Sequence, residues 1–107
     1  MDIQLKRGVV EICVLAAMLK GETYGYQLIK DIEPHIEISE STLYPILKRL
    51  ETSGCLTVRS AEHNGRLRKY YSISYEGMEK IKEFLCNWDS IMKTYKFIKG
   101  EYEDAKR

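Results

Sequence analysis

The first third of the chain has two stretches in which apolar residues recur three or four positions apart, as on one face of an α-helix. In the first stretch, over 5–19, these positions are Leu5, Val9, Ile12, Ala16 and Leu19. In the second, over 24–32, they are Tyr24, Leu28, Ile29 and Ile32. Gly21 suits the end of the first helix, Thr23 the N-cap of the second, and Pro34 its stop. We therefore expect two helices joined by a short turn.

A third amphipathic stretch, over 39–54, contains a proline. Its apolar face consists of Leu43, Ile46, Leu47 and Leu50. Pro45 has no backbone N–H, and inside a helix a proline costs about 3 kcal/mol. With Ser39 or Ser41 as the N-cap, Pro45 falls in the first one or two turns, and with Thr42 as the N-cap it removes no helical hydrogen bond. We therefore predict a helix that tolerates its proline and ends at Gly54.

After Gly54 the period changes from helical to alternating. Residues 55–60 and 69–74 alternate as strands do, and the polar segment 61–68 between them contains the turn dipeptide Asn64-Gly65. This pattern predicts a β-hairpin with its tip over 61–68. In the second strand, Tyr71 and Ile73 share a face that we expect to point inward.

From Tyr75 onward the pattern predicts one long helix with an apolar seam. The seam positions step alternately by three and four, as in a coiled coil. They are Met78, Ile81, Leu85, Trp88, Met92 and Tyr95, widened by Phe84, Ile91 and Ile98. On a single chain this seam would expose large apolar side chains to water. We therefore expect a second copy of the chain to cover it in a homodimer.

Three helices followed by a two-stranded hairpin is the order of the winged form of the helix-turn-helix. In that fold the third helix enters the DNA major groove. We therefore predict a mainly α fold with a small β-hairpin (α+β). Residues 1–74 would form a winged helix-turn-helix DNA-binding domain, and residues 75–107 a long C-terminal dimerisation helix.

The charge distribution supports this reading more than the total charge does. The 107 residues suit one domain, and their net charge is only +1. Between Thr42 and Ser72, however, six basic residues stand against two acidic ones, which gives +4 and leaves −3 for the rest. Such asymmetry is typical of a phosphate-binding face. A solvated basic hairpin is the equally weighted alternative.

Residues that would indicate an enzyme or a metal site are sparse. His35 and His63 stand far apart, and no zinc-protease motif, glycine-rich phosphate loop or nucleophile elbow occurs. Cys13, Cys55 and Cys86 form no C-x-x-C pair, so we expect small buried groups in a reducing compartment. No signal-peptide pattern and no apolar run near 18 residues occurs. We expect a cytoplasmic protein that is no enzyme and uses neither metal nor cofactor.

Several short motifs together resemble PadR-type transcriptional regulators. In chain order they are Arg7-Gly8, Gly25-Tyr26-Gln27-Leu28-Ile29, Ser41-Thr42-Leu43-Tyr44-Pro45, Arg49-Leu50-Glu51, Gly54, Arg68-Lys69-Tyr70-Tyr71 and Glu76-Gly77. The resemblance covers about residues 5–80, and the single last helix resembles the small subgroup of that family. Thr23-Tyr24 and Glu40 depart from the usual pattern. The resemblance implies a dimeric repressor.

In some members of that family, flat aromatic or drug-like compounds bind in a pore at the dimer interface between tryptophans of the last helix. Trp88 falls where that tryptophan would be expected. An interface tryptophan that only packs is the alternative. The residues assigned to the dimer and effector interface are Met78, Ile81, Leu85, Trp88, Asp89, Ile91, Met92 and Tyr95, with Val10, Val14 and Ala17 from the first helix. Asp89 beside an aromatic ring would suit a flat cation.

The residues expected to bind DNA lie in the third helix and the hairpin. Hydroxyls at a helix N-terminus and nearby cations suit phosphate oxygens and base edges. These residues are Ser39, Ser41, Thr42, Tyr44, Pro45, Lys48, Arg49, Arg66, Arg68, Lys69 and Tyr70. Gln4, Lys6 and Arg7 are further candidates for backbone contacts, with plain surface polarity as the alternative.

The sequence thus predicts a sequence-specific DNA-binding regulator, a homodimeric repressor of a pseudo-palindromic operator. Its expected partners are double-stranded DNA, a second copy of the chain and a small aromatic or drug-like effector, and no membrane. The alternative is a winged-helix module that binds only another protein. Salt would separate the two, because phosphate contacts weaken steeply as salt rises.

Overall fold

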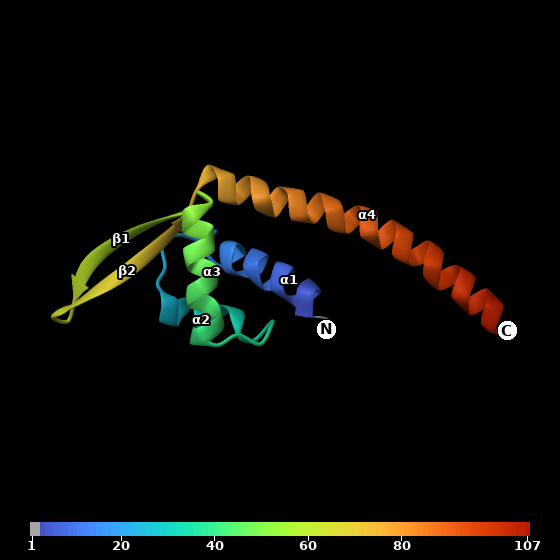
Figure 1. Cartoon of the computed structure of the whole chain (residues 1–107), viewed down its shortest axis with the longest axis horizontal. Helices are drawn as coiled ribbons and strands as arrows, with labels where there is room; N and C mark the ends of the chain where they lie inside the picture. Colours follow the sequence, from blue (N-terminus) through green and yellow to red (C-terminus); the bar gives the residue numbers. More distant parts are fainter. Residues whose placement is uncertain (1–2) are drawn as a thin grey trace.

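The structure, a computed structural model, describes residues 3–107 as four helices and one hairpin (Figure 1). The elements in chain order are α1 (Ile3–Ala16), α2 (Gly25–Ile32), α3 (Glu40–Thr52), β1 (Leu56–His63), β2 (Arg66–Ile73) and α4 (Tyr75–Lys106). This order confirms the predicted three helices, hairpin and long last helix. Among the described residues, no helix is both long and apolar enough to cross a membrane.

The core lies where α1, α2, α3 and the base of the hairpin meet. Its buried apolar residues are Val10, Val14, Leu15, Met18, Leu28, Ile32, Ile38, Leu43, Ile46, Leu47, Leu50, Cys55, Leu56 and Tyr71. The predicted apolar face of α3 is therefore confirmed in full. Val10 and Val14 are 2% and 0% exposed, so the idea that they line an effector site is wrong.

The ends of the predicted first helix differ from the expectation. Leu5 and Leu19 are each 48% exposed, although both share the predicted apolar face. Leu19 lies beyond the end of α1 at Ala16, in turns that lead to Gly21. Leu5 lines an open groove between α1 and α4, so no neighbouring helix covers it completely.

Thr23 does not cap α2, as the sequence had suggested. Tyr24 occupies the N-cap position, and Thr23 pairs with Tyr71 of β2 instead. The Thr23 N–H donates to the Tyr71 carbonyl at 3.0 Å, and the Tyr71 N–H donates to the Thr23 carbonyl at 2.8 Å. The loop before α2 thus adds a one-residue third strand to the hairpin.

Helix α3 begins one residue after Ser39, which is its N-cap. Pro45 is therefore the sixth helical residue, and the hydrogen bond that it removes is the one to the Ser41 carbonyl. Of the alternatives for the cap, Ser39 is the one observed. The proline costs α3 one hydrogen bond near its N-terminus and leaves the rest of the helix intact.

The hairpin is longer than predicted, and its turn is shorter. Strand pairing continues to His63 and Arg66, so only Asn64 and Gly65 form the turn, with φ of +52° and +79°. Two positive φ values are typical of a type I′ turn. The predicted eight-residue tip was wrong, because a two-stranded wing projecting from the core can have polar residues on both faces. Tyr71 is buried at 5% exposure, which confirms its inward direction.

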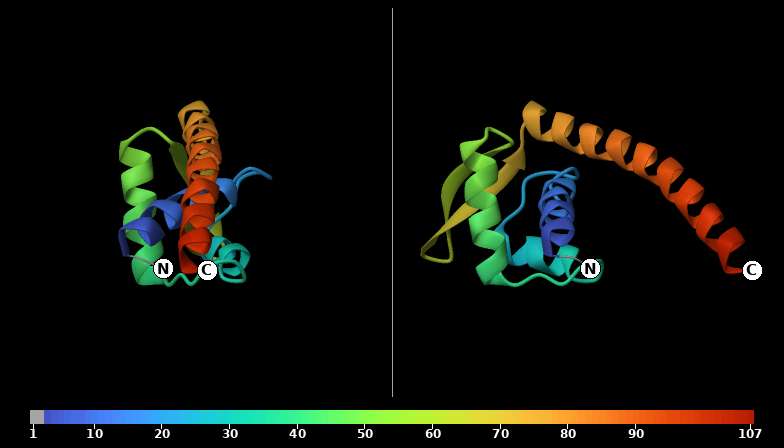
Figure 2. Two further views of the ribbon diagram at one scale, coloured as in Figure 1. Left: turned by 90° about the vertical axis from the view of Figure 1, so that its right-hand side faces the viewer. Right: turned by 45° about the vertical axis from the view of Figure 1, so that its right-hand side comes forward.

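Helix α4 is anchored at its start and projects freely afterwards. The Ser74 hydroxyl accepts from the Gly77 N–H at 3.2 Å and donates to the Gly54 carbonyl at 2.5 Å. Lys80 pairs with Glu11 of α1 at 3.2 Å. From Leu85 to the C-terminus every residue is exposed, and Figure 2 shows this part of α4 extending away from the other elements. The chain therefore measures 66 × 26 × 21 Å, with a radius of gyration of 17.3 Å against about 13 Å for a compact domain of this length.

The cysteines agree with the sequence analysis only in part. Cys55 is buried and Cys13 is half-buried, where burial raises the pKa of its thiol. Cys86 is exposed, so its expected burial was wrong. It lies on the part of α4 that has left the core, where no other element of the chain covers it.

Candidate nucleic-acid interface

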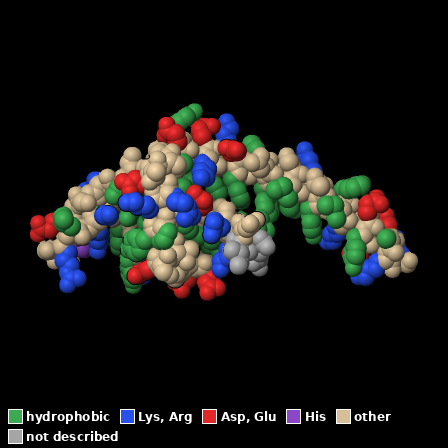
Figure 3. Space-filling model, viewed as in Figure 1, with side chains coloured by type: hydrophobic (Ala, Val, Ile, Leu, Met, Phe, Trp, Pro, Cys, Tyr) green, Lys and Arg blue, Asp and Glu red, His purple; other side chains and the backbone are tan. Residues whose placement is uncertain are grey.

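The outer face of α3 carries most of the side chains predicted to bind DNA. Because its leucines and isoleucine point into the core, the positions between them face solvent. Exposed on this face are Ser39, Ser41, Thr42, Tyr44, Pro45, Lys48 and Arg49. Figure 3 shows Lys and Arg side chains over α3 and out along the hairpin, with some Asp and Glu side chains among them, so both elements contribute basic groups to this face.

The N-terminus of α3 presents a cluster of hydroxyl groups. The Ser39 hydroxyl lies 3.0 Å from that of Ser41 and 3.2 Å from that of Thr42. The N-cap side chain makes no hydrogen bond to the helix backbone. The first N–H groups of α3 and these hydroxyls therefore face the same exposed end, an arrangement suited to anionic oxygen.

A groove of about 710 Å³ separates the start of α2 from the hairpin. Four of the predicted residues line it, namely Tyr44, Arg66, Arg68 and Lys69. Gly25, the first residue of α2, makes the close approach of Tyr44 possible, since a Cβ there would lie 2.6 Å from the Tyr44 hydroxyl oxygen. The groove thus joins α3, the N-terminus of α2 and the hairpin cations in one concave surface.

The cations of this surface fall into two groups. Within residues 3–107, Lys48, Arg49, Arg66 and Lys69 form no ion pair, so their charges are available to a ligand. Arg68 is different, because its guanidinium lies 4.0 Å from the centre of the Tyr24 ring. Arg68 is half-buried, and its guanidinium stacks on the Tyr24 ring of the same chain.

The sequence analysis did not identify Glu22, Tyr24 and Arg59 as members of this region. Arg59 donates two hydrogen bonds of 2.6 Å from Nε and Nη2 to the Glu22 carboxylate. These bonds hold the pKa of Glu22 below its usual range and raise that of Arg59, so both are ionised at neutral pH. Strand alternation could have placed Arg59 beside Tyr70, but no local signal shows that the loop at Glu22 reaches the hairpin.

The outer face of the hairpin holds the second of the paired tyrosines. Tyr70 meets Tyr24 edge to face with ring centres 6.1 Å apart, and the Arg59 guanidinium lies 4.7 Å from the Tyr70 ring centre. Tyr70 is half-buried in these contacts. Its ring is therefore held by the loop before α2.

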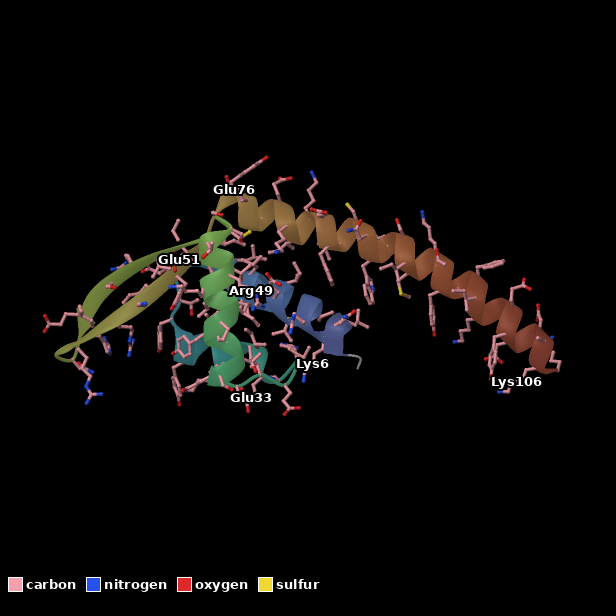
Figure 4. All side chains as sticks on the ribbon, in the orientation of Figure 1. Lys6, Glu33, Arg49, Glu51, Glu76 and Lys106 are labelled. Atoms are coloured by element: carbon pink, nitrogen blue, oxygen red, sulfur yellow. The ribbon has the colours of Figure 1, made fainter. Side chains whose placement is uncertain are left out.

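Residues of α1 that were candidates for backbone contacts lie elsewhere. Gln4 and Arg7 are exposed and Lys6 is half-buried. Figure 4 places Lys6 at the N-terminal end of α1, away from the hairpin, and Arg49 on α3. The structure does not bring these residues into the groove.

The predicted dimer and effector residues divide along α4. Ile81 packs against the core of its own chain, whereas Leu85, Trp88, Ile91, Met92 and Tyr95 are exposed. The Trp88 ring stacks on Phe84, with centres 5.9 Å apart and planes 18° apart. Asp89 instead lines a separate groove with Leu19, Met78 and Leu85. Within the chain, Trp88 and Asp89 therefore lie in different surroundings, and the role of Asp89 at an effector site stays a prediction.

Comparison with known proteins agrees with this architecture. The sequence model of the transcriptional regulator PadR-like family matches residues 14–83, from the last turn of α1 to the first part of α4. The transcriptional regulator Rv3488 of Mycobacterium tuberculosis is 30% identical over 81 residues, 75% of this chain and 76% of that protein. The solved structure of a PadR-like transcription factor from Bacteroides fragilis has a TM-score of 0.79 at 29% identity, covering 89% of this chain and 94% of that one.

One of the matching relatives is much longer than this chain. The negative transcriptional regulator PadR of Bacillus subtilis is 26% identical over 93 residues, 82% of this chain but 51% of that protein. This chain thus spans about half the length of that relative. The winged-helix architecture and the predicted absence of enzyme activity are both confirmed by these matches. The chain belongs to the PadR-like family of transcriptional regulators.

Proposed function

We propose that the chain is a homodimeric repressor that binds a pseudo-palindromic operator with α3 and the hairpin. The observation that carries this proposal is the continuous surface formed by the exposed face of α3, the groove beside it and four cations without acidic partners. A helix of this kind fits the major groove, and a basic wing fits the flanking backbone. Repression is supported by the name of the Bacillus subtilis relative, a negative regulator.

The roles of the DNA-binding residues follow from their chemistry. Tyr44, Pro45 and Lys48 lie on the part of α3 that would face base edges and provide the readout. Arg49, Arg66 and Lys69 would neutralise phosphates, which supply most of the affinity and none of the sequence information. The remaining assigned residues, at the start of α3 and on the hairpin, are Ser39, Ser41, Thr42, Arg68 and Tyr70.

A dimer is supported by the exposed seam of α4. Leu85, Trp88, Met92 and Tyr95 lie at coiled-coil spacing on the part of α4 that stays exposed among the described residues. A two-fold axis through this seam would place two copies of α3 on one side of the DNA. Their half-sites would lie one helical turn, about 34–36 Å, or slightly more apart.

Release by an effector is the least direct part of the proposal. The stacked rings of Phe84 and Trp88 offer a flat apolar platform at the edge of the seam. A planar aromatic compound bound there would change the angle between the two copies of α4 and with it the spacing of the recognition helices. Since Trp88 is the only tryptophan, its fluorescence would report binding.

The first experiment compares binding of the protein to its own upstream DNA and to a scrambled duplex, at about 50 and 200 mM salt. We expect selective binding of two protomers per site that weakens steeply with salt. Replacing both Lys48 and Arg49 by alanine should weaken operator binding, lower the salt dependence by about one phosphate contact through the loss of Arg49, and reduce the discrimination between the two duplexes through the loss of Lys48. The matched control, with Lys82 and Lys93 of α4 replaced, should bind normally. Equal weak binding to both duplexes would contradict a role for this DNA and favour a protein partner.

The effector is tested with acridine orange, a planar aromatic cation. Quenching of Trp88 fluorescence in the absence of DNA, together with weaker operator binding in its presence beyond what DNA intercalation alone causes, is the expected result. A compound that binds beside Trp88 without changing operator affinity would contradict the proposed induction.

A further inference from the structure

The hairpin is attached to the rest of the molecule by a set of contacts on its outer face. We call Glu22, Tyr24, Arg59, Arg68 and Tyr70 the wing clamp. Glu22 holds Arg59 through two hydrogen bonds. The rings of Tyr24 and Tyr70 meet edge to face, and Arg68 covers the Tyr24 ring. The clamp thus joins the loop before α2 to both strands.

The backbone beneath the clamp explains why these side chains meet. Thr23 pairs with Tyr71, so the loop runs antiparallel to β2 for one residue. Side chains alternate along extended backbone, so Glu22 and Tyr24 emerge on the same face as Tyr70. The Thr23 side chain points the other way, where its hydroxyl is buried and has no hydrogen-bond partner among the described residues. Thr23 is therefore held by two backbone hydrogen bonds and by its burial, without a hydrogen bond from its side chain in residues 3–107.

The clamp contacts the hairpin beyond its base, where it can fix the direction in which the hairpin projects. Arg59 pairs with Tyr70, midway between the base and the turn, and Arg68 pairs with Ala61 two positions further out. A two-stranded hairpin has little stability of its own. Without the clamp, the direction of the hairpin would depend on the Thr23–Tyr71 backbone pairing and on buried side chains at its base, such as Leu56.

We propose that Glu22 and Tyr24 are positioning residues that fix the angle between the hairpin and α3, and so let the hairpin cations reach the DNA when α3 is in the major groove. This inference rests on the proposed function. The clamp acts through Arg66 and Lys69, which lie on the same hairpin and remain unpaired within residues 3–107. Glu22 and Tyr24 therefore contribute to recognition through the hairpin, and the Glu22 carboxylate itself would be repelled by phosphate.

Because of that repulsion, the proposal and simple electrostatics predict opposite changes in operator affinity when the charge of Glu22 is removed. Glu22→Gln removes a negative charge near the DNA-binding surface, and electrostatics alone predicts equal or tighter binding to any duplex. Loss of the clamp predicts the opposite for the operator. We expect Glu22→Gln to weaken operator binding about fivefold and to leave binding to the scrambled duplex unchanged or tighter. Glu62→Gln, which removes the same charge from a part of the hairpin outside the clamp, should not weaken either.

Tyr24 allows a second matched pair, because all its contacts in the clamp use the ring. Tyr24→Leu removes the ring and should weaken operator binding about as much as Glu22→Gln. Tyr24→Phe keeps the ring and should bind as the unmodified chain does. If the phenylalanine variant is as weak as the leucine variant, the hydroxyl itself acts on DNA and the positioning role of Tyr24 is overturned.

Amide hydrogen exchange at Thr23 and Tyr71, measured by NMR on the free protein, tests the clamp without DNA. Exchange should be faster in Glu22→Gln and Tyr24→Leu and unchanged in Tyr24→Phe and Glu62→Gln. Unchanged exchange in all four variants, or undiminished operator binding by Glu22→Gln, overturns the proposal. If the unmodified protein does not distinguish the two duplexes, the proposed function fails on this DNA, and the exchange rates alone decide whether Glu22 and Tyr24 hold the hairpin.

Discussion

The two parts of α4 share one pattern of apolar residues but lie in opposite surroundings. In the first part, up to Phe84, Gly77 packs against the Cys55 carbonyl and Ile81 packs on the core. In the second part, from Leu85 onward, every side chain is exposed. The same face that meets α1 in the first part continues beyond its reach in the second.

This difference teaches what a periodic pattern specifies and what it leaves open. The spacing of Ile81, Leu85 and Trp88 determines that they share a face of the helix. It contains nothing about which element covers that face at each turn. Here the chain's own core covers Gly77 and Ile81 of the first part, whereas the second part is exposed from Leu85 onward.

The largest expected effect is on the free energy of unfolding, when a glycine in either part of α4 is replaced by alanine and one methyl group is added. In Gly77→Ala the new Cβ would collide with the Cys55 carbonyl oxygen and with the Ile73 side chain. We expect a loss of about 3 kcal/mol in the free energy of unfolding, measured by urea denaturation. Gly100→Ala is the control, since a Cβ there meets nothing within 4 Å. It should stabilise the helix by up to about 1 kcal/mol. Equal effects at both sites would contradict the description of the first part as anchored.

The next effect concerns the exposed part alone. Met92→Glu places a charge in the seam, and in a symmetric dimer the charge enters twice. We expect the dimer dissociation constant to rise about 30-fold, measured by analytical ultracentrifugation, with little change in the folded monomer. Phe97 is exposed on the opposite side of α4, so Phe97→Glu should leave the dimer intact. Dissociation by both substitutions would mean that the seam is not the interface.

The smallest effect tests the contact that joins the first part to α1. Lys80 and Glu11 form a partly buried ion pair, and such pairs contribute about 0.5–1 kcal/mol. Lys80→Gln should lower the free energy of unfolding by that amount, and a double-mutant cycle with Glu11→Gln should assign the loss to the pair. Lys82→Gln, at an exposed position without an ion pair in residues 3–107, should have no measurable effect. A loss equal for Lys80 and Lys82 would exclude the pair as its cause.

Local patterns predicted the elements and the α3 face well because both depend on residues close in sequence. The face of α3 follows from the spacing of Leu43, Ile46, Leu47 and Leu50, which also determines which side chains stay outside. The strand ends were less predictable, because the outer hairpin has no buried face to impose alternation. The Asn64-Gly65 turn was predicted, but the strand pairing that continues up to His63 and Arg66 beside it was not.

The errors at the site have one physical cause, which is long-range packing. Thr23 suits an N-cap by its chemistry, yet pairing with Tyr71, 48 positions along the chain, takes precedence. Val10 and Val14 lie on the apolar side of α1, and only the arrangement of the helices shows that they are fully enclosed. Asp89 follows Trp88 in sequence but points into another groove. Contacts of this kind require the fold before they can be assigned.

The length of α4 has a mechanical consequence. Its 32 residues correspond to about 48 Å, and they join the domain through the first part of the helix, at Gly77, Lys80 and Ile81. A tilt of about 5° at that joint moves the far end of the helix by about 4 Å over this length. In the proposed dimer the far ends of the two helices are held together. A displacement of a few ångströms where the helices meet would then rotate each winged domain by only a few degrees. Helix α4 would thus convert ångström-scale changes in packing at the dimer contact into rotations of the winged domains by a few degrees.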